Sequence, residues 1–358
     1  MTKYRIIISL DYELPVHKNP DVNRYIIEPT NKLMDICDKN QAILTIMVEV
    51  GELIAFEKEY NKEFIDYLGY NPAMVIKEQL KDAVRRGHDV QLHLHPQWLD
   101  AKWLDGFWKL NYSKYSFSEF TFGEFTKVIK YAKKYLEANL LPFNKDYRCI
   151  GFRAGNWITQ PSDIYLKSLK CAGILSDSSV FKGGEKDSGA VYYDYKNAYS
   201  RTLPWFTSRQ DINLPSKMET VLELPIYAKE VSLIELITFK RLLLSLKYFP
   251  ENWLIEKRSK NINENTNSFF TFYNTFKKLF KNSKYPKKFD FCKLQDNEMI
   301  EIFNEIILSN ELNNVDYNVP VVLIGHSKET NTFDDLENFL IHLNRNYIDR
   351  VIYSSYQS

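Results

Sequence analysis

Residues 89–96 read Asp-Val-Gln-Leu-His-Leu-His-Pro, and this run decides how the rest of the chain is interpreted. Polar and apolar residues alternate, which is typical of a β-strand, so His93 and His95 point to the same face. Two imidazoles side by side are half of a metal site. The chain has only 6 His, yet two histidines that simply form hydrogen bonds at a strand end would explain the run equally well.

The composition is that of an ordinary globular protein, with 358 residues, 44% hydrophobic and 26% charged. The formal net charge of +1 predicts no nucleic-acid partner. The 4 Cys are far apart and form no Cys-x-x-Cys pair, so we expect reduced thiols. The sequence shows no signal-peptide pattern and no run of about 18 uncharged apolar residues. We therefore predict a cytoplasmic protein with no transmembrane segment.

Short apolar runs alternate with helical patterns along the chain. We predict strands over residues 5–10, 42–48, 89–95, 149–152, 174–176, 221–226 and 321–324, with an eighth short strand at 351–353. We predict helices over residues 29–40, 72–86, 124–139, 161–172 and 331–344. Such alternation is typical of an α/β fold with parallel strands and helices outside. Seven or eight units suit a (β/α) barrel, although an open doubly wound sheet would give the same pattern.

One segment departs from this alternation. Residues 240–293 hold 13 Lys/Arg against 4 Asp/Glu. We predict a basic helical and loop insertion at about 231–300, between the sixth and seventh units of a single domain that spans 1–358. The insertion could make weak peripheral contact with an anionic membrane surface, although a solvated lysine-rich loop is the simpler interpretation.

In parallel α/β folds the chemistry lies at the carboxyl ends of the strands. At the ends of six of the seven main predicted strands, all except the second, we single out ionisable or metal-capable side chains. These side chains are Asp11, Glu13, His93, His95, Arg153, Asp177, Glu223 and His326. Any one of them could be a helix cap or an ion-pair partner. Together they can supply the parts of a mononuclear metal hydrolase: a metal site, a carboxylate base held by an arginine, and a histidine acid.

These residues, in this order, resemble the polysaccharide deacetylase superfamily, the NodB homology domain of carbohydrate esterase family four. Its Thr-Phe-Asp-Asp-Gly motif resembles Ser-Leu-Asp-Tyr-Glu at residues 9–13. Its second motif resembles residues 87–93, with the second histidine at His95 instead of four residues on, at Gln97. Its remaining motifs resemble the segments at residues 153–157, 177–179 and 323–326.

The resemblance implies a distorted (β/α) barrel with seven or eight units. It also implies one bound divalent metal ion, with zinc as the first candidate. It implies the metal ligands Glu13, His93 and His95, the base Asp11, its partner Arg153 and the acid His326. The family's metal-binding aspartate would fall on Tyr12, so Glu13 takes this role on an Asp-x-Glu pattern; Asp11 remains the other candidate for the carboxylate ligand.

The resemblance also implies a hydrolase of C–N bonds other than peptide bonds, above all one that removes acetyl from an N-acetylated sugar in bacterial cell-surface polysaccharide synthesis or modification. A cyclic-amide hydrolase and an inactive carbohydrate-binding barrel are the alternatives. The expected partner is a carbohydrate, free or linked to a nucleotide or lipid. Further candidates for substrate contact are Trp98, Trp157, Asp177 and Glu223, although structural packing or strand capping would explain them equally well.

Overall fold

The computed structural model of the protein describes residues 2–15, 21–189, 191–218, 220–232, 284–312, 315, 317–329 and 333–357. Two compact units divide the chain: Met1–Ala228 with Lys288–Ser358, and Lys229–Lys287. Most of the predicted basic insertion, residues 233–283, lies outside the described residues. At the described ends of the second unit, β12 (Ala228–Ser232) pairs with β13 (Lys284–Lys288).

The first unit is built on a curled sheet in which nine strands take part. In spatial order the path is β10 (Trp205–Phe206), β11 (Leu222–Glu223), β7 (Ser176–Asp177), β6 (Gly151–Ala154), β3 (Asp89–Leu94), β2 (Leu44–Glu49), β1 (Tyr4–Tyr12) and β14 (Val319–His326), with β15 (Val351–Tyr353) also on β1. All these pairings are parallel except that of β10 with β11.

The sheet forms a half-barrel whose open side is spanned, among the described residues, by single bridges. Ile226, just after β11, forms a parallel bridge with Val322 of β14, and Asp290 forms another with Ile324. The N–H of Tyr227 donates to the carbonyl of Val322 at 3.3 Å. The distorted α/β barrel predicted from the sequence is therefore confirmed, and the open doubly wound sheet is not what the chain forms.

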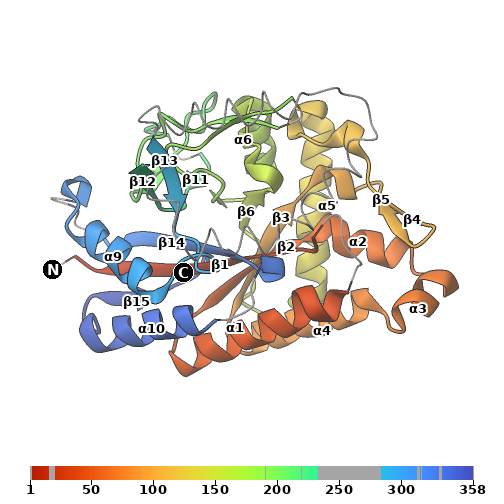
Figure 1. Cartoon of the computed structure of the whole chain (residues 1–358). Helices are drawn as coiled ribbons and strands as arrows, with labels where there is room; N and C mark the ends of the chain where they lie inside the picture. The colour runs from red at the N-terminus through yellow and green to blue at the C-terminus, as the bar shows by residue number, and fades with distance from the viewer. Residues whose placement is uncertain are drawn as a thin grey trace, which may run out of the picture. The chain divides into compact units, whose positions relative to one another are not determined.

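Helices cover the outside of the sheet, and Figure 1 shows α10, α1 and α4 running along one side of it. In the part of the chain that the structure describes, the α-helices are α1 (Glu28–Lys39), α2 (Val50–Lys58), α3 (Lys62–Leu68), α4 (Pro72–Arg85), α5 (Phe122–Leu140), α6 (Ser162–Cys171), α9 (Asp296–Ile307) and α10 (Asp334–Asn346). Outside this sheet, β4 (Lys102–Leu104) forms a hairpin with β5 (Phe107–Lys109), and β8 (Glu185–Asp187) forms a hairpin with β9 (Tyr192–Asp194). Over the described residues, every helix is too short or too polar to cross a membrane.

Local chemistry explains where several helices begin and end. α4 ends before Gly87, whose φ of 87° lets the N–H of His88 turn back to the carbonyl of Ala83 at 2.9 Å. α5 begins two residues earlier than predicted because Thr121 and Glu124 form a capping box. α2 was not predicted, because its residues 50–56 are all buried and show no amphipathic period.

A buried pair of carboxyl groups joins β7 to β11. Asp177 and Glu223 are opposite each other in the strand register, and both are fully buried. Burial, and then the charge of Asp177, raise the pKa of Glu223 well above its usual value. Glu223 Oε2 is buried and accepts no hydrogen bond from the described residues. A proton on this oxygen would let it donate to Asp177, so we infer that the two carboxyl groups share one proton.

This proton predicts how stability depends on pH. A carboxyl group with a raised folded-state pKa stabilises the fold below its unfolded pKa of about 4.5, and this stabilisation is lost as pH rises through the folded pKa. Glu223→Gln mimics the protonated group at every pH. The free energy of unfolding of Glu223→Gln, taken relative to that of the wild type, should therefore rise as the pH goes from about 5 to about 8. The rise should be at most about 1.4 kcal/mol per pH unit.

The measurement is urea unfolding of both proteins across this pH range. Glu63→Gln, at an exposed position of α3, serves as the control and should track the wild type. A constant difference between Glu223→Gln and the wild type would mean that Glu223 is ionised in the folded protein throughout.

Candidate metal centre and active site

The carboxyl ends of four strands bring the predicted site residues together. The strand register places Asp11 of β1 opposite His326 of β14, and His93 of β3 opposite Arg153 of β6. Glu13 follows β1 directly and His95 follows β3 directly. Parallel strands present their carboxyl ends at one edge, so residues far apart in sequence share one site.

Glu13, His93 and His95 form a compact group of possible metal ligands. Their ligand atoms all lie within 4.8 Å of one another, and all three residues are buried. Glu13 Oε2 lies 2.9 Å from His95 Nε2 and 3.7 Å from His93 Nε2. Atoms that bind one tetrahedral zinc ion at its usual bond lengths lie about 3.3 Å apart, so the observed separations need only small adjustments.

The hydrogen bonds of His93 leave its outer nitrogen free for a ligand. His93 Nδ1 lies 2.9 Å from the carbonyl oxygen of Arg153, which can only accept, so Nδ1 carries the proton. Nε2 is then a lone pair, and it is buried with no hydrogen-bond partner. Such an orphaned lone pair facing a carboxylate is the arrangement that a bound metal satisfies.

His95 is held in place from three sides. Its backbone N–H donates to Glu49 Oε2 at the end of β2, and its Nδ1 lies 3.2 Å from the Gln97 amide. Asn156 Nδ2 also lies 3.3 Å from His95 Nδ1, and Gln97 Oε1 is buried without a partner. A half-turn of both amides would let their oxygens accept from Nδ1–H and leave Nε2 as a lone pair. A Cβ on Gly155 would lie 2.5 Å from His95 Cγ, so only glycine allows this close approach.

Asp11 is held by a fully buried guanidinium. Arg153 Nη1 donates to Asp11 Oδ1 at 2.6 Å. Burial alone would raise the pKa of Asp11, but the opposite charges around it, above all that of Arg153, lower this pKa overall. The second terminal nitrogen of the guanidinium, Arg153 Nη2, donates to Ser9 Oγ at 2.8 Å.

His326 stands across from Asp11 at the end of β14. Its Nε2 lies 3.5 Å from Asp11 Oδ2, and its Nδ1 lies 3.6 Å from Glu329 Oε2. Asp290, His326 and Glu329 form a second group of possible metal ligands. Lys293 Nζ lies 2.8 Å from Glu329 and 3.3 Å from Asp290, so one lysine already forms ion pairs with both carboxylates.

The structure adds charged groups that sequence reasoning missed. We expected no ionisable side chain after the second strand, which was wrong: β2 runs one residue further and ends at Glu49. Lys328 Nζ donates to Glu13 Oε1 at 2.7 Å, on the oxygen that does not face the histidines. Glu52 Oε2 accepts from the N–H of Leu14 at 3.1 Å, and burial is the main cause that raises the pKa of Glu52 to about 8.

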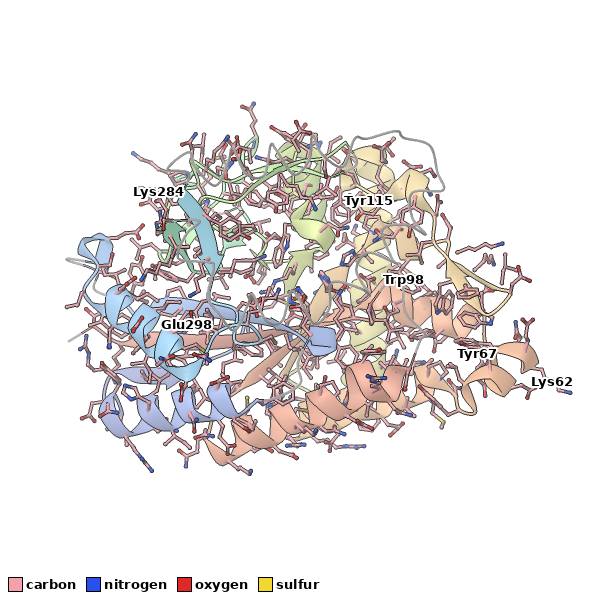
Figure 2. All side chains as sticks on the ribbon, in the orientation of Figure 1. Lys62, Tyr67, Trp98, Tyr115, Lys284 and Glu298 are labelled. Atoms are coloured by element: carbon pink, nitrogen blue, oxygen red, sulfur yellow. The ribbon has the colours of Figure 1, made fainter. Side chains whose placement is uncertain are left out.

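The four candidate substrate residues have packed surroundings. Trp98, labelled in Figure 2, is buried with its ring 5.3 Å from that of Trp108. Trp157 is half-buried, and Lys288 Nζ lies 4.1 Å from the centre of its ring. The carboxyl groups of Asp177 and Glu223 make the buried contacts between strands described above. Whether any of the four touches a substrate stays a prediction.

Comparison with known proteins shows what the fold resembles. No family profile matches the sequence, and no curated protein matches it. Among solved structures, the chain is similar over 99% of its length to 70% of a "putative glycoside hydrolase/deacetylase" from Parabacteroides distasonis, with a TM-score of 0.55 and 11% identity. The chain therefore has a deacetylase-like fold, as the motifs predicted.

Two further solved structures are similar over 99% of this chain. One is a "putative polysaccharide deacetylase" from Mycobacterium smegmatis, matched over 87% of its length with a TM-score of 0.46 and 12% identity. The other is PuuE allantoinase, matched over 88% of its length with a TM-score of 0.48 and 9% identity.

The geometry predicts that the protein binds one divalent metal per chain. His93→Ala and His95→Ala should each reduce the metal content below about a tenth of the wild-type content, because two remaining ligands bind too weakly. Elemental analysis after gel filtration in zinc-containing buffer measures this. His342→Ala, on α10, is the control and should keep its metal. Full occupancy in either site variant would show that the metal binds elsewhere.

Proposed function

We propose that this chain is a metal-dependent hydrolase that removes acetyl from an N-acetylated sugar. The observation that carries the proposal is the juxtaposition of the orphaned Nε2 of His93 with Glu13 and His95, next to an Asp11–Arg153 ion pair that faces His326. A metal site alone could be structural. A metal site beside a separate carboxylate and a separate histidine has the parts that hydrolysis needs.

Asp11 acts as the general base. A divalent metal, with zinc as the first candidate, would be held by Glu13, His93 and His95. When bound, it would act as a Lewis acid that polarises a carbonyl and makes water more acidic. Asp11 takes the proton from the water whose oxygen attacks the acetyl carbon. Arg153 keeps Asp11 ionised and fixes its direction through the 2.6 Å hydrogen bond, so Arg153 acts as a positioning residue.

His326 acts as the general acid. As the C–N bond breaks, the sugar amine leaves as a poor leaving group unless it gains a proton, and His326 Nε2 donates one. Glu329 lies 3.6 Å from His326 Nδ1 and can stabilise the charged imidazole. The products are acetate and the free amino sugar. The facing positions of Asp11 and His326 favour an enzyme over an inactive binding barrel.

The test is acetate release from a panel of N-acetylated sugars, nucleotide sugars, lipid-linked sugars and one cyclic amide, with added zinc and with a chelator. We expect zinc-dependent release from at least one sugar. Asp11→Asn should keep the metal and lose activity by about 10²–10⁴-fold, because the amide cannot take the proton. Turnover of the cyclic amide alone would replace the sugar substrate in this proposal. No turnover of any compound by the metal-loaded protein would overturn it.

The role of His326 can be separated from that of Asp11 by the leaving group. His326→Ala should slow hydrolysis of the N-acetyl amide by about 10²-fold or more and should affect an aryl acetate much less, because a phenolate leaves without a proton. The rates for the amide and the aryl acetate are measured on metal-loaded variants. Asp11→Asn is the comparison variant, and it should hydrolyse both substrates more slowly. Equal losses on the two substrates in His326→Ala would assign the acid to another residue.

A further inference from the structure

Among four cationic side chains near the site, Lys288 differs from the others in its partners. Arg153, Lys328 and Lys293 each lie within 3.3 Å of a carboxylate oxygen. Lys288 is within ion-pair distance of no carboxylate among the described residues. Its Nζ lies instead 4.1 Å from the ring centre of Trp157 and 4.5 Å from that of Phe181. These are cation–π distances, and they leave the ammonium group without an anion of its own.

The aromatic platform under Lys288 is fixed by the backbone. Asn156 and Trp157 have φ angles of 55° and 61°, a left-handed conformation that non-glycine residues rarely adopt. The hydroxyl of Tyr195 donates to the carbonyl of Trp157 at 2.6 Å, and Phe181 packs edge-on against the indole with ring centres 5.6 Å apart. Strained backbone held by surrounding contacts is common at functional sites.

The platform is continuous with the proposed active site. Trp157 lies four residues after Arg153, and the Arg153 guanidinium carbon lies 6.0 Å from the indole centre. Burial lowers the pKa of Lys288 to about 8, and the charges of Asp290, Asp11 and Glu329 act against this fall. The ammonium group is therefore only partly compensated by its surroundings, and an anion in contact with it would hold it charged.

We propose that Lys288 is a subsite for an anionic group of the substrate, a carboxylate or a phosphate carried next to the N-acetylated sugar. The proposal rests on the proposed function and narrows its substrate class to acidic or phosphate-linked sugars. The Trp157 and Phe181 rings hold the ammonium group in place before binding, so little side-chain entropy is lost when the anion arrives.

Electrostatics favour an anion over a neutral group at this position. Asp11, Glu13, Asp290 and Glu329 bring four negative charges to this region, and Arg153, Lys328, Lys293 and Lys288 bring four positive charges, although Lys288 pairs with none of these carboxylates. A divalent metal on Glu13, His93 and His95 would then give the site a net positive charge, which an anionic substrate would neutralise.

The experiment measures binding and does not depend on turnover. Glucose 1-phosphate, glucuronate and glucose are titrated by calorimetry into the wild type, Lys288→Met, Lys288→Arg and the control Lys284→Met, all loaded with zinc. Lys284 is an exposed lysine on β13, labelled in Figure 2, and it pairs with Glu230. Thermal unfolding confirms that each variant is folded.

We expect at least one anionic sugar to bind the wild type about 10-fold or more tightly than glucose, as a charge-assisted hydrogen bond gives. Lys288→Met should lose this preference, while Lys288→Arg and Lys284→Met should keep it. Preference for glucose 1-phosphate alone would assign a phosphate-linked sugar, and preference for glucuronate alone an acidic sugar. No preference in the wild type, or an unchanged preference in Lys288→Met, would overturn the subsite.

The two proposals fail separately. Zinc-dependent acetate release from neutral N-acetylated sugars, with no anion preference, would refute the subsite and leave the proposed function standing. An anion preference that depends on Lys288, with no acetate release from any sugar, would refute the proposed function and show a binding site for anionic sugars.

Discussion

The buried guanidinium of Arg153 is the contact on which the site depends. It is fully buried, and the desolvation of a charge of this kind costs several kcal/mol unless each N–H finds a partner. Arg153 donates to Asp11, to Ser9 Oγ and to the carbonyl of Ser178. Its Nη2 also lies 3.3 Å from the hydroxyl of Tyr356, near the end of the chain. One side chain therefore ties β6 to β1, to the segment after β7 and to the C-terminal residues.

The remaining buried charges follow from the same constraint. A buried carboxylate stays ionised where a cation lies beside it: Arg153 forms an ion pair with Asp11, and Lys328 forms one with Glu13. Glu49 and Glu52 have no such cation at ion-pair distance among the described residues, and burial raises the pKa of both. The two ionised carboxylates are those to which we assign chemistry, and the two with raised pKa values hold backbone N–H groups of His95 and Leu14. Charge and hydrogen-bond partner thus separate the carboxylates that we propose for metal binding and proton transfer from the carboxyl groups that position the backbone.

The apolar runs of the sequence predicted the strands that carry the site, because buried parallel strands need apolar side chains on both faces. Strand ends then predicted where Asp11, Glu13, His93, His95, Arg153 and His326 would meet. The contacts that depend on three-dimensional neighbours could not be read in this way. Lys328 reaches Glu13 across 315 positions of sequence, and Lys288 meets Trp157 from beyond residues 233–283. The one signal missed in the sequence itself was Glu49, which a strand one residue longer would have placed at the shared edge.

Solvent exposure differs between the two sides of the candidate site. His93 and Glu13 are only 2% and 5% exposed, whereas the side chains of Lys328 and Glu329, just after β14, are 20% and 34% exposed. This is also the side where single bridges replace a continuous ladder, since Asp290 contacts β14 through one bridge with Ile324. The candidate metal ligands therefore belong to the continuous part of the sheet, whereas Lys328 and Glu329 follow β14 on the side where the single bridges lie.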